Sequence, residues 1–232
     1  MNQEIISLPL FSAQVIRSKR KKSIAIQIKQ GKVLIRAPER TKLSELKALL
    51  IKKSRWIEEK LSTPSYLQSV PEKKYIDSEE YLFLGKALRL SIKLSSNYKV
   101  VIGEDSLTFY LPTQNPITIK HGLEQWYLQQ AEEYLVQRVN YYEKIIGKSP
   151  TSILVKRYKS RWGSCSTTGQ VTFNWLIMMA PPAVIDYVVI HELCHLHEPN
   201  HSPAFWQLVE RFQPDYKSYK QWLKEKGHTL YC

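Results

Sequence analysis

The chain has 232 residues, a mass of 27.2 kDa and a formal net charge of +13. Hydrophobic residues make up 43% of it and charged residues 24%, which is ordinary globular usage and argues against bulk disorder. Three cysteines are too few for a disulfide scaffold, and no apolar run approaches the roughly 20 residues that span a bilayer. We therefore expect a cytoplasmic protein without a membrane partner, built as one large or two small domains.

The positive charge is concentrated at the start of the chain. Residues 1–60 contain 15 basic and 5 acidic residues, so +10 of the net +13 lies there. Such a region can attract a polyanion, which makes nucleic acid or a nucleotide an alternative partner. A charged patch carries no specificity by itself, so we favour the simpler interpretation of a solvated surface.

The first half of the chain predicts short strands and one helix. Apolar residues alternate with smaller or polar ones, and turn residues separate the runs. The expected strands are Ser12–Ile16, Ser23–Ile28, Lys32–Arg36, Tyr81–Phe83, Leu88–Leu94, Lys99–Ile102 and Ser106–Leu111. Leucines at helical spacing predict a helix from about Leu43 to Lys60, and the polar segment Ser62–Pro71 is expected to be a loop or linker.

The pattern becomes mainly helical after Pro116. Helices are expected over Leu123–Ile146, Ala183–His197, from Ser202-Pro203 onward and over Tyr216–Lys226, with strands at Ser152–Arg157 and Val171–Trp175. The predicted fold class is α+β, with a basic, β-rich region over residues 1–115 and a helix-dominated part over residues 116–232. The two parts could also form one continuous unit, and no internal repeat is evident in the sequence.

Four of the six histidines lie between positions 191 and 201. His191 and His195 are four residues apart, so on a helix both imidazoles face one ion. Glu192 lies beside them, where its carboxylate could take a proton from a metal-bound water. Two histidines and a glutamate on a mostly apolar helical turn are difficult to satisfy without an ion. The pattern predicts a zinc hydrolase site with one Zn²⁺ per chain and Glu192 as the general base.

The third zinc ligand is less certain from spacing. His201 follows His195 after a turn at Pro199-Asn200 and is our choice, whereas Glu210 on the next helix is the main alternative. His197 is a weaker rival because it points away from the face of His195. The metzincin pattern fails here, since no methionine follows the motif.

A second cluster, Arg157 to Cys165, precedes the metal-binding helix. Gly163 permits a close backbone approach, and Cys165 has no neighbouring cysteine or nucleophile motif, so we interpret it as a packing residue. Cys194 is expected to pack as a small hydrophobic residue, and Cys232 has no evident partner.

These motifs together resemble the YgjP-like metallopeptidase family, which is related to the SprT-like zinc proteases. The resemblance extends over essentially the whole chain. It rests on the segments Arg161–Cys165, Phe173–Leu176, Ala180-Pro181, Tyr187–Leu196, Asn200-His201 and Phe205-Trp206.

The resemblance implies a zincin-like (minigluzincin) catalytic part with zinc on His191, His195 and His201 and with Glu192 as general base. It also implies that the strand around Arg161–Cys165 borders the cleft. Residues expected to bind substrate are therefore Arg157, Arg161, Trp162, Gly163, Ser164 and Tyr187. An oxyanion donor is expected among Arg157, Arg161, Tyr187, Tyr216 and Tyr219, without a choice between them.

The resulting hypothesis is a zinc metallopeptidase that cleaves peptides or proteins through an activated water. One alternative is a zinc-dependent nucleotide pyrophosphohydrolase, because the same water can attack phosphorus. Another is a nucleic-acid-associated protein with a structural zinc. An intact Glu192 argues against the last, because structural zinc sites usually close with four protein ligands.

Overall fold

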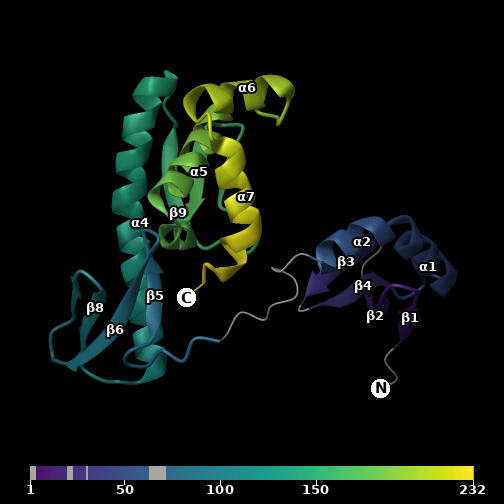
Figure 1. Ribbon diagram of the computed structural model, residues 1–232, viewed down its shortest axis with the longest axis horizontal. Coiled ribbons are helices and arrows are strands. Elements are labelled where there is room, and N and C mark those ends of the chain that lie inside the picture. The colour runs from purple at the N-terminus through teal and green to yellow at the C-terminus, as the bar shows by residue number, and fades with distance from the viewer. Residues whose placement is uncertain (1–3, 20–22, 30, 63–71, 232) are drawn as a thin grey trace. The chain divides into compact units, whose positions relative to one another are not determined.

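The computed structural model describes residues 4–19, 23–29, 31–62 and 72–231 (Figure 1). The chain forms two compact units, Met1–Pro71 and Glu72–Cys232. Each unit has its own hydrophobic core. No helix within these ranges is long and apolar enough to cross a bilayer.

The first unit is a four-stranded sheet with helices on one face (Figure 1). Its elements are β1 (Ile5–Ser7), β2 (Ser12–Ser18), β3 (Ala25–Lys29), β4 (Lys32–Pro38), α1 (Leu43–Lys52) and α2 (Ser54–Leu61). The strand order is β1-β2-β4-β3, with β2 and β4 parallel and the other pairs antiparallel. Alternate strand residues and one stripe of the helices supply the core, including Ala13, Val33, Ile35, Leu46, Leu50 and Ile57.

The second unit begins with a sheet of the same topology. Its elements are β5 (Glu80–Phe83), β6 (Lys86–Leu94), β7 (Lys99–Ile102), β8 (Ser106–Leu111) and the long helix α4 (Pro116–Ile146). The order is β5-β6-β8-β7, again with one parallel pair, β6 and β8, between two antiparallel pairs. The chain therefore contains a structural repeat of four strands and a helical segment. The sequence did not reveal it, because the repeat lies in topology rather than in matching residues.

The rest of the second unit carries the histidine cluster. A three-stranded sheet of order β10-β11-β9 is formed by β9 (Ser152–Lys156), β10 (Gly163–Cys165) and β11 (Gln170–Asn174). It is followed by η1 (Trp175–Met179), α5 (Pro182–Cys194), α6 (Pro203–Phe212), α7 (Tyr216–Lys226) and η2 (Gly227–Thr229). In Figure 1, α5 lies between α4 and α7.

The β5–β6 turn joins the sheet to the start of α5. Leu84 donates its N–H to the carbonyl of Met178 at 2.7 Å, and both Leu84 and Gly85 have positive φ angles. A Cβ on Gly85 would lie 3.0 Å from Cα of Pro181. The hydroxyl of Tyr127 on α4 donates to the carbonyl of Leu82 at 2.6 Å. One hydrophobic core therefore runs from this sheet to α5 and α7.

This shared core places the division of the chain at Pro71 and not at residue 115, where the change in composition had suggested it. The β-rich segment from Glu80 to Leu111 packs on the first half of α4 and belongs with the helical part. Composition follows secondary structure, whereas a domain boundary depends on which residues share a core.

Several elements differ in extent from the sequence-based expectation. The helix expected over Leu43–Lys60 is broken at Lys53, and β1 was not expected. The strand expected around Arg161–Cys165 is β10, which begins at Gly163. Helix α4 begins at Pro116, where the side chain of Asn115 accepts a hydrogen bond from the N–H of Ile117. The expected loop Ser62–Pro71 lies, beyond Ser62, outside the described residues, as does Cys232.

Candidate metal centre and active site

Three histidines meet at the end of α5. His191 lies in the last turn of α5, His195 is its C-cap, and His201 lies in the loop before α6. One ring nitrogen from each lies within 4.8 Å of the others, and Nε2 of His191 and Nε2 of His201 are 3.0 Å apart. The helical spacing predicted that His191 and His195 share a face, and the reversal of the chain after α5 brings the His201 imidazole to them.

Backbone and aromatic contacts hold these imidazoles in place. Nδ1 of His195 is 3.1 Å from the carbonyl oxygen of Glu198, so that nitrogen carries the proton and Nε2 is left with a lone pair. The buried ring of Phe205 stacks on His195 with centroids 4.4 Å apart. Trp206 stacks on His201 with centroids 5.5 Å apart and an interplanar angle of 17°. The first turn of α6 therefore orients two of the three histidines.

The residues at this cluster fit a metal ion. Tetrahedral zinc with nitrogen ligands at about 2.1 Å separates those nitrogens by about 3.4 Å, close to the 3.0 Å found between Nε2 of His191 and Nε2 of His201. Burial and the neighbouring histidines lower the pKa of His191 to about 3, and burial also lowers the pKa of His195. The imidazoles of His191 and His195 are therefore neutral at pH 7, which is the form that binds metal.

Glu192 is buried beside the histidine cluster, with 5% of its surface exposed. Burial raises the pKa of Glu192 to about 8, and the charge of Arg161 opposes this shift. A Cβ placed on Gly163 would lie 2.5 Å from Oε1 of Glu192. Edge strand β10 can therefore pass over this carboxyl group only because position 163 has no side chain.

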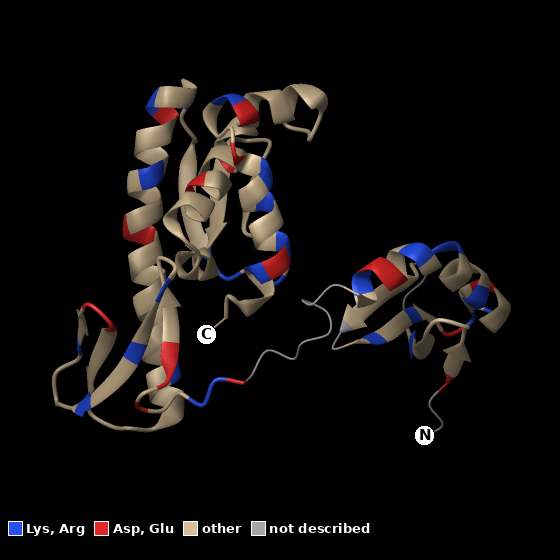
Figure 2. Cartoon of the chain, viewed as in Figure 1, with Lys and Arg blue, Asp and Glu red and all other residues tan. Residues whose placement is uncertain are grey.

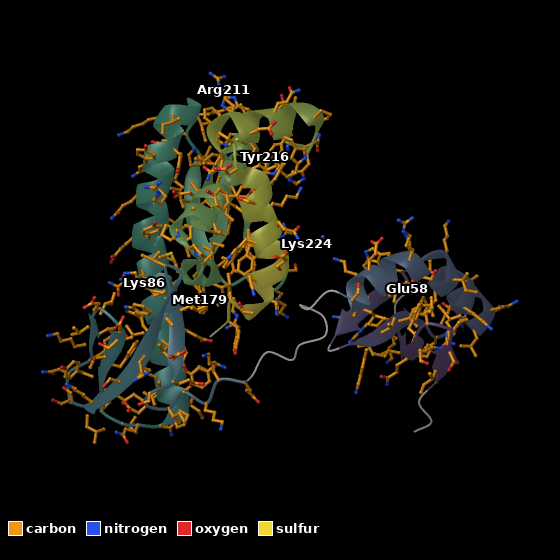
Figure 3. The ribbon with its side chains drawn as sticks, viewed as in Figure 1. Glu58, Lys86, Met179, Arg211, Tyr216 and Lys224 are labelled. Atoms are coloured by element: carbon orange, nitrogen blue, oxygen red, sulfur yellow. The ribbon has the colours of Figure 1, made fainter. Side chains whose placement is uncertain are left out.

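Tyrosines from α5 and α7 line the other side of the cluster. Tyr187 lies one turn before His191, and the centroids of their rings are 5.9 Å apart. The centroid of the Tyr187 ring is 6.5 Å from that of Tyr219. Burial, with the charges of Glu192 and Tyr216, raises the pKa of Tyr187 to about 12, so its hydroxyl keeps its proton at neutral pH. Tyr216, at the start of α7 beside α6 in Figure 3, stacks on Trp206.

Other residues expected at the site have different surroundings. Arg157 pairs with Glu124 at 3.0 Å and lies over the ring of Trp175. The indole ring of Trp162 packs against Gly227, because a Cβ on that glycine would lie only 3.0 Å from the ring. Ser164 shares a hydrogen bond of 2.7 Å with the Tyr158 hydroxyl.

The alternative ligands lie away from the cluster. Glu210 is exposed and pairs with Lys217 at 3.0 Å, and Nε2 of His197 is 3.3 Å from the carbonyl oxygen of Ile146. Cys194 is fully buried, as its expected packing role requires. Cys165 is half-buried, and burial with the Glu192 charge raises the pKa of its thiol, so the thiolate is disfavoured.

Two supporting contacts were not anticipated from the sequence. The Asn174 side-chain amide donates to the carbonyls of Tyr158 and Arg161, which fixes the segment that leads into β10. Arg138 on α4 forms two hydrogen bonds of 2.6 and 2.8 Å with Asp186 on α5. Asp186 is a charged residue among the mainly apolar residues that precede His191 in α5. This charge in an apolar segment was the only indication in the sequence that Asp186 has a partly buried partner.

The family profile of the YgjP-like metallopeptidase domain matches residues 22–226. The chain belongs to the YgjP-like metallopeptidase family. The resemblance seen in the sequence motifs is thereby confirmed.

The crystal structure of the metallopeptidase zymogen abylysin from Pyrococcus abyssi is similar, with 22% identity over 38% of this chain and 89% of that chain, at a TM-score of 0.35. No curated protein matches the sequence significantly.

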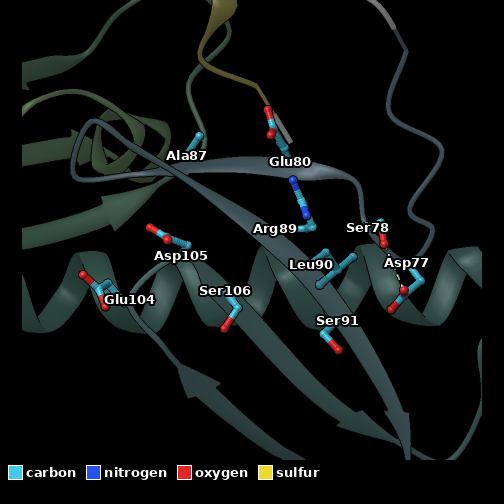
Figure 4. Close-up of a pocket in the computed structure, with 10 residues that line it drawn as sticks. All are labelled: Asp77, Ser78, Glu80, Ala87, Arg89, Leu90, Ser91, Glu104, Asp105 and Ser106. Atoms are coloured by element: carbon cyan, nitrogen blue, oxygen red, sulfur yellow. Dashed lines mark hydrogen bonds between the residues drawn. The ribbon is translucent and has the colours of Figure 1, made fainter.

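The YgjP-like chain also has an acidic cavity of about 690 Å³ at the sheet β5–β8 (Figure 4). Asp77, Glu80, Glu104 and Asp105 line it together with Arg89. None of these residues belongs to the His191–His195–His201 group, which is the only metal-ligand cluster among the described residues. The cavity is therefore separate from the candidate metal centre.

Proposed function

We propose that this chain is a zinc-dependent peptidase that holds one zinc ion with His191, His195 and His201. The observation that supports this most directly is the convergence of three imidazoles beside a buried carboxyl group. Three protein ligands leave a coordination position open, which is typical of catalytic rather than structural zinc. When bound, zinc lowers the pKa of water and polarises a carbonyl group.

Glu192 is proposed as the general base. It is adjacent in sequence to His191, and its buried carboxyl group has a pKa of about 8, near the working range of a group that must both accept and return a proton. We infer that Glu192 takes the proton from the attacking water and passes it to the leaving nitrogen of the cleaved peptide bond.

Strand β10 is proposed to bind the substrate backbone. It is an edge strand of its sheet, and Gly163 brings it directly against Glu192. An extended peptide that pairs with this edge would place a carbonyl group near the histidine cluster. Such main-chain pairing favours polypeptide substrates over nucleotides, because it uses the repeating amide groups of a chain.

Tyr187 is proposed as the donor that stabilises negative charge on the carbonyl oxygen. The pKa of its hydroxyl is about 12, so the group stays protonated at neutral pH, and its ring contacts His191. Arg161 supplies the positive charge that acts on Glu192. Arg157 is bound to Glu124 and is the weaker choice for this role.

The test is cleavage of an unfolded, fluorescently labelled protein by the zinc-loaded chain. We expect Glu192→Gln to abolish cleavage while zinc remains bound, and Glu198→Gln, a change close to the cluster that leaves its backbone carbonyl in place, to keep activity. A parallel assay measures release of phosphate or pyrophosphate from nucleoside triphosphates. Nucleotide hydrolysis that depends on Glu192, without peptide cleavage, would contradict the proposal.

A further inference from the structure

The first unit has a groove at the free edge of its sheet. A cavity of about 280 Å³ lies between β3 and the helices α1 and α2. It is lined by Ile24, Ile26, Leu49, Lys53 and Trp56. The walls are thus apolar, with one cation, and 41% of the Trp56 surface is exposed.

The edge of the groove is a strand that can accept another strand. β3 is the last strand in the order β1-β2-β4-β3, and among the described residues it pairs only with β4. Exposed sheet edges are usually protected by charges, proline or a bulge. Residues Ala25 to Ile28 of β3 have none of these features, and one charged residue, Lys29, ends the strand. Among the described residues, the outer N–H and C=O groups of β3 are therefore available for main-chain pairing.

The second copy of the repeat shows what occupies the corresponding position. There, Tyr98 directly precedes β7, packs edge-on against Phe109 with centroids 6.4 Å apart, and donates its hydroxyl to the carbonyl of Gly122 on α4. In the first copy the residue directly before β3 is Ile24, which is shorter. A cavity of about 320 Å³ still lies between Tyr98 and α4 in the second copy, so both copies of the repeat have a hollow beside this strand. The groove beside β3 differs in that the shorter Ile24 lines it in place of a tyrosine.

Charge determines which polypeptide fits. Lys53 is the only charged side chain among the described residues that line the groove, and residues 1–60 carry a net charge of +10 (Figure 2). Nucleic acid would also be attracted, but it is usually bound by several stacking aromatic residues along a basic track. Here the walls are mainly aliphatic, and the free strand edge matches a polypeptide backbone.

We propose that the groove formed by β3, Leu49, Lys53 and Trp56 binds an extended, acidic polypeptide segment as an added β-strand. Alternate apolar side chains of the segment enter the groove, and its carboxylates face Lys53. This inference rests on the proposed peptidase function, because it assigns unfolded, acidic polypeptides as the preferred substrates and a second place on the chain where they bind.

Binding of a defined peptide to the full-length, zinc-loaded Glu192→Gln chain tests this inference without turnover. The probe is a fluorescent, disordered 12-residue peptide that alternates valine or phenylalanine with aspartate or glutamate. We expect Trp56→Ala and Lys53→Glu each to weaken binding at least about tenfold. The matched controls are Ile51→Ala, at a residue 55% exposed, and Lys52→Glu, both outside the groove lining, and these should bind as the parent chain does.

Three results would overturn the inference. Equal loss of binding in Lys53→Glu and Lys52→Glu would indicate attraction by net charge alone. Unchanged binding in Trp56→Ala would exclude the groove, and binding of a single-stranded oligonucleotide to the groove in preference to the peptide would assign it to nucleic acid.

Cleavage of a labelled substrate by the otherwise wild-type chain is measured separately. Binding without cleavage would contradict the peptidase proposal alone, whereas cleavage without groove binding would contradict this inference alone.

Discussion

Gly163 and Glu192 are in such close contact that a single added carbon atom at position 163 would overlap the glutamate carboxyl group. The Cβ of an alanine there would lie 2.5 Å from Oε1 and 2.6 Å from Cγ of Glu192. The edge strand and the proposed general base therefore fix each other's positions. This relationship connects the strand proposed to bind the substrate with the group proposed to move the proton.

Gly163→Ala should consequently impair catalysis more than metal binding. The added methyl group must displace the Glu192 carboxyl or β10, and a displacement of about 1 Å can reduce the rate about 100-fold. The three atoms nearest to the added Cβ all belong to Glu192 and none to a histidine, so zinc content should remain near one per chain. Measurement of kcat together with zinc content separates the two effects. Loss of zinc in Gly163→Ala, or full activity with zinc bound, would contradict this interpretation.

Trp206 should act on metal affinity through His201. Its ring stacks on the His201 ring and also on the Tyr216 ring, and the Lys220 ammonium group lies 3.9 Å from its centroid. Trp206→Ala removes this support and is expected to weaken zinc binding about tenfold, within the range found when groups that orient metal ligands are removed. Trp206→Phe keeps a stacking ring and should retain most of the affinity.

Competition with a chromogenic zinc chelator measures this effect directly. Lys220→Met, which removes the cation but leaves the tryptophan, is the matched control and should have little effect. Equal zinc affinity in Trp206→Ala and the parent chain would show that the His201 position does not depend on the stacking.

The ion pair between Arg138 and Asp186 should contribute to the stability of the second unit. Both side chains are mostly buried, and the pair connects the middle of α4 to α5. Asp186→Ala leaves the Arg138 guanidinium without its main partner and should reduce the free energy of unfolding by about 1–3 kcal/mol. The double variant Arg138→Met, Asp186→Ala should recover part of that loss, because no unpaired charge remains.

Urea denaturation of the parent chain, Arg138→Met, Asp186→Ala and the double variant measures the coupling. Purely additive effects of the two single changes would show that the pair contributes no interaction energy.

Glu79 should make the stability of the second unit depend on pH. Burial raises the pKa of Glu79, but hydrogen bonds from the Tyr81 hydroxyl and the backbone N–H groups of Lys74 and Tyr75, with the charge of Lys73, outweigh it and lower the pKa below 4.5. A lowered pKa in the folded state stabilises the fold at pH values above the unfolded pKa. That stabilisation is lost as the pH falls through the folded value.

The difference in unfolding free energy between the parent chain and Glu79→Gln should therefore be largest near pH 7 and shrink below about pH 4. Glu80→Gln, at the exposed neighbouring position, serves as the control. A difference that stays constant from pH 7 to pH 3 would contradict the role given to these hydrogen bonds.

The candidate metal centre was more predictable from the sequence than the packing around it. Helical spacing brings His191 and His195 to one face, and Pro199-Asn200 permits the turn that returns His201. These are local relationships within eleven residues. Arg138 and Asp186 are separated by 48 residues, so only the fold brings them together.

The fold class was confirmed as α+β. The start of α4, the break at Lys53 and the order of the strands were not predicted from the sequence. The start of α4 is marked by an asparagine cap and a proline at its first position, and the leucine pattern alone placed it too late. The break at Lys53 has no glycine or proline to mark it. The repeated topology was not detected because tertiary packing fixes strand order, whereas an alternating apolar pattern permits several orders.

Zinc stoichiometry is the measurement that tests the central claim most directly. Elemental mass spectrometry is applied to the full chain, purified without a histidine tag, alongside His201→Ala and Glu210→Ala. We predict close to one zinc per chain in the parent and in Glu210→Ala, and a marked loss in His201→Ala. A parent chain that contains no zinc and takes none up after supplementation would contradict the account, as would zinc that depends on Glu210 and not on His201.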